Sequence, residues 1–208
     1  MKKLRNLAAV LAVSIGFSTP VLAEGTVGLV LSTLNNPFFV TLKEGAEQKA
    51  KELGYSILVL DSQNDPAKEL ANVEDLLSKK IALLMINPTD SDAVVSAIRA
   101  ANRANIPVVT LDRGATGGKV LSHVASDNVQ GGMMAGELIL KALRRSVKVV
   151  ELQGVPGTSA ARDRVEGLHA DIAAAKDVVV VASQPADLDR TNGHNMMEHI
   201  LQAHADNN

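Results

Sequence analysis

Seven short runs of apolar, β-branched residues recur along the chain and constrain its fold more than any other feature. Their starts lie 29, 26, 25, 14, 27 and 31 residues apart. Most of these spacings fit one strand plus one helix, and such alternation predicts an α/β fold with a parallel sheet. The runs are apolar throughout, which is typical of strands buried on both faces. They are Thr26–Leu31, Tyr55–Leu60, Ile81–Ile86, Ile106–Leu111, Val120–Ala125, Val147–Leu152 and Val178–Ser183.

The segments between these runs carry helix start signals. Asn36 before Pro37 and Asp65 before Pro66 each place a capping side chain ahead of a proline suited to the first helical position. The first of these helices is expected to end before Gly54. Further helices are predicted from Asp127 or Asn128 to about Arg145, from Ser159 to about Ala174, and from Asp189 to about His204. Gly131 and Gly132 cost a helix about 1 kcal/mol each against alanine, so close packing is expected there.

Two irregularities interrupt this rhythm. Only residues 112–119 separate the fourth run from the fifth, too few for a helical crossover. One explanation is that the chain passes between two lobes at this point. After the last predicted helix the rhythm requires another strand, but the sequence stops at Asn208. A βα unit is begun and not finished, which predicts a shortened chain.

The N-terminus has the pattern of a secretory signal peptide. Basic residues precede an apolar run that ends in small residues at Ala23. A membrane anchor is the alternative, but the apolar run is short for a span. Export to a periplasm with cleavage after Ala23 is therefore predicted. The mature chain would then have 18 basic and 23 acidic residues. No block of like charge is present, so nucleic acid is not an expected partner.

Polar side chains follow each of the first five predicted strands. Ligands of open α/β sheets bind outside the carboxyl ends of the strands. Amides, carboxylates and an arginine at this edge suit a small polyhydroxylated ligand, whose apolar ring face could pack on Phe38 and Phe39. Each residue alone could instead be a cap or turn residue, and the phenylalanines could belong to the core. The polar set is Ser32, Asn35, Asn36, Asp61, Gln63, Asn64, Asn87, Thr89, Asp90, Asp112, Arg113, Ser126, Asp127 and Asn128.

The sequence has no pattern that indicates catalysis, a cofactor or a metal. The loop after the first strand lacks the glycines of phosphate-binding motifs, and no G-x-S-x-G occurs. The glycines of 154–157 are interpreted as a tight turn between strand and helix. His194, His199 and His204 recur every five residues, about 140° apart per step on a helix, and are expected in solvent. His123 is expected to be a core histidine.

Several segments together resemble the periplasmic sugar-binding proteins of ABC transporters, in particular those for D-ribose. The resemblance runs from about Gly25 to His204. It implies a type I periplasmic binding fold, with two Rossmann-like doubly wound lobes over residues 24–126 and 127–208, the second incomplete. The segments are Leu31–Phe39, Val59–Asn64, Ile86–Asp92, Thr110–Arg113, His123–Asn128, Gly157–Arg162 and Ala182–Asp187.

The resemblance also implies a function and its partners. A monomer would close its lobes on one monosaccharide and deliver it to a membrane ABC permease, and some members of the family signal to chemoreceptors. No cofactor or metal is implied. Three alternatives stay open: a nonfunctional truncated fragment, a LacI-type effector-domain regulator, and an exported α/β enzyme. The signal peptide and the lack of a helix-turn-helix disfavour the regulator, and the lack of a catalytic set disfavours the enzyme.

The family's site residues carry over by position. In the first lobe, Phe38 and Phe39 would form one slice of an aromatic sandwich around the sugar, while Asp112 and Arg113 would bind its hydroxyls. Leu188 stands where the family has an aromatic residue, which would weaken stacking by about 0.5–1.5 kcal/mol. Family members also continue beyond residue 208 with further pocket residues. The remaining matched positions are Ser32, Asn36, Asn87, Ser126 and, from the second lobe, Arg164.

Overall fold

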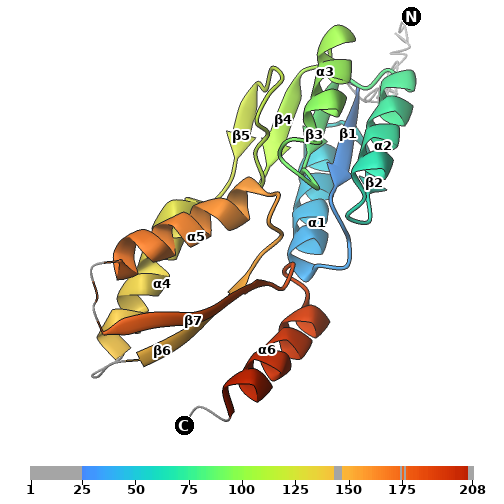
Figure 1. Ribbon diagram of the computed structural model, residues 1–208. Coiled ribbons are helices and arrows are strands. Elements are labelled where there is room, and N and C mark those ends of the chain that lie inside the picture. Colours follow the sequence, from blue (N-terminus) through green and yellow to red (C-terminus); the bar gives the residue numbers. More distant parts are fainter. Residues whose placement is uncertain (1–24, 143–146, 174, 176, 206–208) are drawn as a thin grey trace, which may run out of the picture.

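The computed structural model describes residues 25–142, 147–173, 175 and 177–205. They form two parallel sheets with helices packed on their faces (Figure 1). The predicted signal peptide lies outside the described residues. Within the part of the chain that the structure describes, no helix is both long and apolar enough to cross a bilayer.

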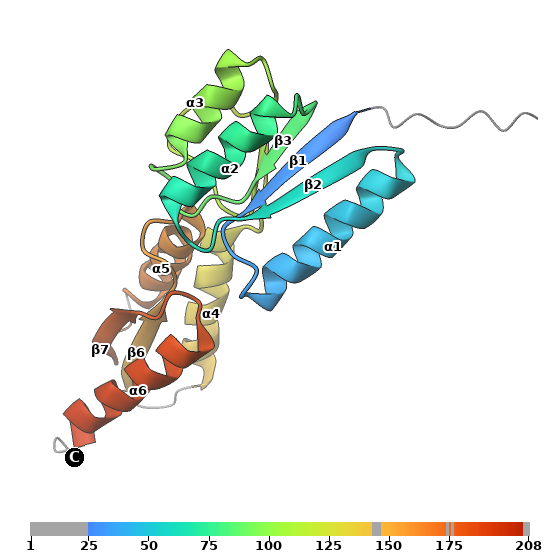
Figure 2. The same cartoon turned by 90° about the vertical axis from the view of Figure 1, so that its right-hand side faces the viewer.

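The first sheet has five parallel strands in the order β2-β1-β3-β4-β5. Helices α2 and α3 cover one face, and α1 lies on the other (Figure 2). The strands are β1 (Thr26–Leu31), β2 (Ser56–Asp61), β3 (Leu83–Ile86), β4 (Val108–Leu111) and β5 (Ser122–Val124); the helices are α1 (Pro37–Glu52), α2 (Pro66–Ser78) and α3 (Val95–Arg103).

Most of the buried apolar side chains belong to this sheet. On the α2–α3 side, Val30, Leu84 and Ile86 pack against Leu76 and Ile98, all fully buried. A smaller cluster lies under α1 and contains Leu29, Leu31 and Phe39. The predicted caps form as expected, since Asn36 accepts a hydrogen bond from Phe38 N and Asp65 accepts from Ala67 N. The first sheet therefore supplies the rigid base of the molecule.

The interpretation of residues 112–119 as a crossing between lobes is wrong. β4 and β5 are parallel neighbours in the same sheet, with Thr110 opposite His123. The connecting segment turns back over the end of α3, where the Asn102 side chain donates to Lys119 O and accepts from Lys119 N. The chain leaves the first sheet only after β5. α3 begins without a capping side chain at Val94, so its start has no local signal in the sequence.

The second sheet consists of two parallel strands, β6 (Val147–Gln153) and β7 (Val178–Pro185). Helices α4 (Asn128–Ala142) and α5 (Ser159–Ile172) lie on one side of it, and α6 (Arg190–Ala205) lies on the other (Figure 1). The expected close packing at Gly132 is confirmed, because a Cβ there would collide with the α5 backbone at Arg164. Gly131 has open space instead.

Some strands are less buried than their apolar sequences predict. β5 is exposed at all three residues, because it is an edge strand and no described helix covers it. His123 is therefore exposed rather than a core residue, although its Nδ1 lies 2.8 Å from Thr110 Oγ1. His194 has a side chain 70% exposed beside Glu198, in agreement with the expectation of a solvated histidine.

Candidate functional site

A cavity of about 350 Å³ lies between the carboxyl edge of the first sheet and the segment that follows β7. This volume is within the usual range for small-molecule sites. Its walls are mostly polar side chains around one buried ring. The lining residues are Thr33, Asn35, Asn36, Pro37, Phe39, Asn64 and Arg113 from the first sheet, and Asp187, Leu188, Asp189 and Arg190 from the segment after β7.

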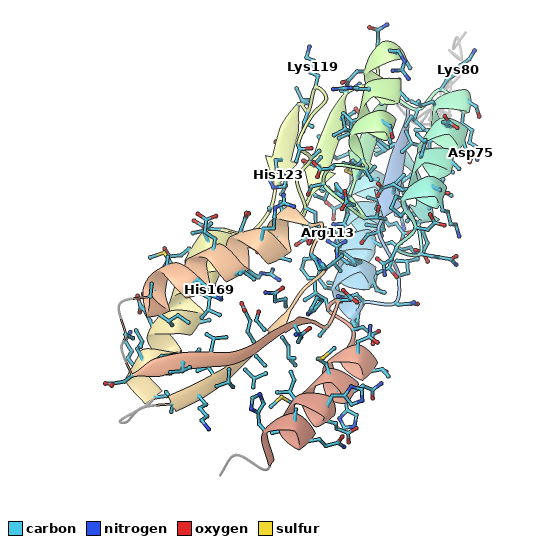
Figure 3. The ribbon with its side chains drawn as sticks, in the orientation of Figure 1. Asp75, Lys80, Arg113, Lys119, His123 and His169 are labelled. Atoms are coloured by element: carbon cyan, nitrogen blue, oxygen red, sulfur yellow. The ribbon has the colours of Figure 1, made fainter. Side chains whose placement is uncertain are left out.

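Arg113 is the buried cation of this cavity, and Figure 3 shows it at the junction of the two sheets. The residue is 2% exposed, and its Nη1 donates a hydrogen bond to Pro88 O at 3.0 Å. Its guanidinium carbon lies 5.2 Å from the centre of the Phe39 ring, a cation–π distance. Burial lowers the pKa of Arg113, whereas the carboxylates of Asp112 and Glu69 oppose that change. The fork of donors is therefore held rigidly at the cavity wall.

Asp112 lies beside Arg113, and buried polar side chains of the sheet edge hold its carboxylate. The Asn87 side-chain amide donates to Leu111 O at 2.9 Å and to Asp112 Oδ2 at 3.4 Å. Ser32 Oγ in turn donates to Asn87 Oδ1 at 2.6 Å. Ser32 and Asn87 are fully buried and do not line the cavity. These two predicted site residues thus support Asp112 from the interior of the sheet edge.

The two phenylalanines differ in placement, since Phe39 lies in the core and at the cavity wall whereas Phe38 lies in neither. Phe39 is 1% exposed and packs with Leu29 and Leu31, yet it also lines the cavity. Phe38 is 54% exposed and meets Phe39 edge to face, with ring centres 5.3 Å apart. Asn36 likewise caps α1 and lines the cavity. One residue can therefore serve the fold and the site together.

Backbone in the left-handed region is concentrated around this cavity. Asn64, Asp112, Asp187 and Leu188 have φ angles of 56°, 60°, 56° and 56°. This conformation is uncommon outside glycine, above all for a bulky residue such as leucine. Strained backbone of this kind costs about 1–3 kcal/mol per residue and tends to cluster at functional sites.

Four predicted site residues line the cavity, namely Asn36, Phe39, Arg113 and Leu188. The other six do not: Ser32, Phe38, Asn87, Asp112, Ser126 and Arg164. Ser126 and Arg164 are exposed, and Arg164 lines a separate cavity of about 290 Å³ between β6, α4 and α5. Conversely, sequence reasoning missed Asp187, Asp189 and Arg190, which line the first cavity. They follow β7 as the other site residues follow their strands. Extending the carboxyl-end rule from the fifth strand to the seventh would have found them.

Hydrogen bonds join the two sheets beside the cavity. Ser91 N donates to Gly157 O at 3.0 Å, and Ser159 N donates to Ser91 Oγ at 3.0 Å. Ser159 Oγ accepts from Gly114 N at 2.8 Å. The first turn of α5 is thereby attached to the loops that follow β3 and β4, and this attachment holds the second sheet in register with the cavity.

The family model described as periplasmic binding protein domain matches residues 27–208. The chain belongs to the periplasmic binding protein family. It is 57% identical to the ribose import binding protein of Escherichia coli over 206 residues, which are 99% of this chain and 69% of that protein. The corresponding protein of Bacillus subtilis is 51% identical, over 88% of this chain and 59% of its own length.

Solved structures agree with this assignment. The Caulobacter myo-inositol binding protein bound to myo-inositol matches with a TM-score of 0.83 and 29% identity, over 87% of this chain and 62% of that one. A solute binding protein of Mycobacterium smegmatis with bound glycerol matches with a TM-score of 0.84 and 32% identity, over 88% and 63%. The chain thus spans less than two thirds of these structures. The predicted family, the type I fold class and a binding role rather than an enzymatic one are confirmed.

Proposed function

We propose that this chain binds a monosaccharide, first of all D-ribose, in the cavity beside Arg113. The observation that carries the proposal is the buried Arg113 guanidinium held over Phe39 with Asp112 at its side. A rigid donor fork, a carboxylate acceptor and an aromatic face are the groups that a sugar ring requires. The ligand named for the Escherichia coli and Bacillus subtilis relatives supports ribose over other sugars.

Each predicted residue then has a distinct role. Arg113 and Asp112 bind sugar hydroxyls, Asn36 adds an amide, and Phe39 packs on the C–H face of the ring. Leu188 supplies an aliphatic wall opposite. Ser32 and Asn87 align Asp112 from behind, and Phe38 covers the rim.

Lobe closure would complete this site. Residues 24–126 and 127–208 act as two lobes in this proposal, and the ligand favours their closed arrangement by contacting both. Arg164 and Ser126, exposed at present, would approach the sugar on closure. The electrostatic effect of Arg164 on Arg113 supports that approach.

The cellular role follows from the same family. Residues 1–23 would direct export to the periplasm, where the monomeric chain would deliver its sugar to an ABC permease and, as a second output, signal to a chemoreceptor.

Thermal unfolding with and without millimolar D-ribose tests the proposal. Binding to the native state raises the midpoint by mass action. Asp112→Asn should abolish the shift, whereas Asp75→Asn on the exposed side of α2 should keep it. A midpoint indifferent to ribose and to related monosaccharides would contradict the proposal and leave the chain as a fragment without this activity.

A further inference from the structure

Glu69 is a buried carboxyl group that does not line the sugar cavity. It lies on α2 and is 1% exposed. Both of its oxygens face Thr89, in the segment after β3. Oε2 accepts from Thr89 N at 2.7 Å, and Oε1 lies 3.2 Å from Thr89 Oγ1. A charged group is rarely buried without a specific partner, so its placement requires an explanation.

The Thr89 contact leads directly to the cavity. Residue 88 is a proline, which has no N–H to anchor it, so its neighbours must hold it. Asn87 N donates to Val30 O at 2.9 Å on one side, and Thr89 N donates to Glu69 on the other. The Pro88 carbonyl between them accepts from Arg113 Nη1. Glu69 is therefore the acceptor for the N–H of the same peptide unit that supplies this carbonyl.

Glu69 and Arg113 also interact electrostatically. Arg113 lowers the pKa of Glu69 and Asp90 raises it, but burial is the largest influence and raises the pKa to about 7. The charged groups acting on Arg113 are Asp112, Glu69 and Arg164. Near neutral pH, the negative charge of Glu69 beside Arg113 is thus present when Glu69 is ionised and absent when Glu69 is protonated.

We propose that Glu69 is a positioning residue of the sugar site, which fixes the Arg113 guanidinium through Thr89 and the Pro88 carbonyl and modulates it by its charge. This inference rests on the proposed function for its effect on sugar affinity. The ionised carboxylate makes the stronger, charge-assisted bond to Thr89 N. Sugar affinity should therefore rise as the pH increases through about 7.

Three variants of the chain separate these contributions. Glu69→Gln keeps an acceptor for Thr89 N but cannot change its charge, and its amide N–H would donate to Thr89 Oγ1, which in the wild type donates to Glu69 Oε1. Glu69→Leu removes both contacts, and Glu74→Gln makes the same change of charge at an exposed position of α2. The dissociation constant for D-ribose is measured by calorimetry between pH 5.5 and 8.5.

The wild type and Glu74→Gln should gain about threefold or more in affinity across this range, because the bond to Thr89 becomes charge-assisted. Glu69→Gln should bind with an affinity that does not vary with pH. Glu69→Leu should lose about tenfold, the consequence of losing two buried hydrogen bonds. A Glu69→Gln variant that keeps the wild-type pH profile would overturn the proposal.

A ligand-free measurement separates this inference from the proposed function. The NMR resonance of Arg113 Nε–Hε should shift with a midpoint near pH 7 in the wild type and in Glu74→Gln, but not in Glu69→Gln. This outcome supports the positioning role even where no sugar binds. An Arg113 resonance indifferent to Glu69→Gln overturns it, and this variant carries the test if Glu69→Leu fails to fold.

Discussion

The two sheets follow the same alternation of strand and helix but differ sharply in burial. In the first sheet, Leu29, Leu84 and Ile86 are fully buried between helices on both faces. In the second sheet, Leu152 is 40% exposed and Val179 is 52% exposed. Apolar strand sequence alone does not produce a core, because burial depends on how many neighbours a strand has. The rigid groups of the cavity accordingly come from the first sheet, and the second adds only residues 187–190.

The sharpest contrast should come from the same substitution in each sheet. Leu29→Ala removes a fully buried side chain and should lower the free energy of unfolding by about 2–5 kcal/mol. Leu152→Ala in β6 should cost less than about 1 kcal/mol. Urea unfolding of both variants measures the difference. Equal losses would mean that the second sheet is as tightly packed as the first.

The pH dependence of stability should single out the first sheet. The pKa of Glu69 is raised to about 7 in the folded state from an ordinary 4.5, so the folded state binds the proton more tightly. This stabilisation is fully present below pH 4.5 and is lost as the pH rises through about 7, amounting to up to about 3 kcal/mol.

Urea unfolding from pH 4.5 to 8 measures this effect as the difference between the wild type and Glu69→Gln. Glu74→Gln serves as the control and should follow the wild type. A wild type and Glu69→Gln with parallel pH curves would contradict the prediction.

The glycine contact between α4 and α5 tests whether the two sheets unfold together. Gly132→Ala places a methyl group against the α5 backbone and should destabilise the second sheet by about 1–3 kcal/mol. Gly131→Ala, one residue earlier in open space, should stabilise α4 by up to about 1 kcal/mol. Measured by hydrogen exchange, Gly132→Ala should accelerate the exchange of backbone amides in β6 and β7 more than in β1. Uniform acceleration would instead indicate one cooperative unit.

The cavity wall contributed after β7 can be strengthened. Leu188→Phe should improve D-ribose affinity by about 0.5–1.5 kcal/mol, because an aromatic ring would then oppose Phe39. Leu201→Phe, on α6 and remote from the cavity lining, is the control. Calorimetric titration measures both variants. A loss of affinity in Leu188→Phe would mean that the left-handed backbone at this position cannot direct the ring into the cavity.

The smallest effect is expected at the junction of the sheets. Ser159→Ala removes the acceptor of the Gly114 N–H and should cost about 1 kcal/mol. Ser96→Ala, an exposed serine of α3 whose Oγ donates to Ala93 O just before the helix, should change little. Thermal midpoints with and without ribose measure the effect. If the two serines behave alike, the bond from Gly114 N to Ser159 Oγ contributes nothing to stability.

The sequence by itself determined the order of the strands, every helix except α3, the parallel sheet and the edge at which polar residues gather. These features follow from local patterns: apolar runs, the caps at Asn36 and Asp65, and the side chains that directly follow each strand. The family resemblance added Leu188 and Arg164 as site positions, and of these two the cavity lining contains Leu188.

Only the tertiary structure decided which of these residues touch. Asn87 reaches Ser32 across 55 residues, and Ser159 reaches Ser91 across 68. No local sequence pattern predicts contacts between residues this far apart in the chain. The exposure of β5, the short connection from β4 and the double role of Phe39 likewise depend on which elements become neighbours. The placement of Glu69 against Thr89 belongs with them, because a helix-face glutamate is ordinarily solvated and only packing against another segment can bury it.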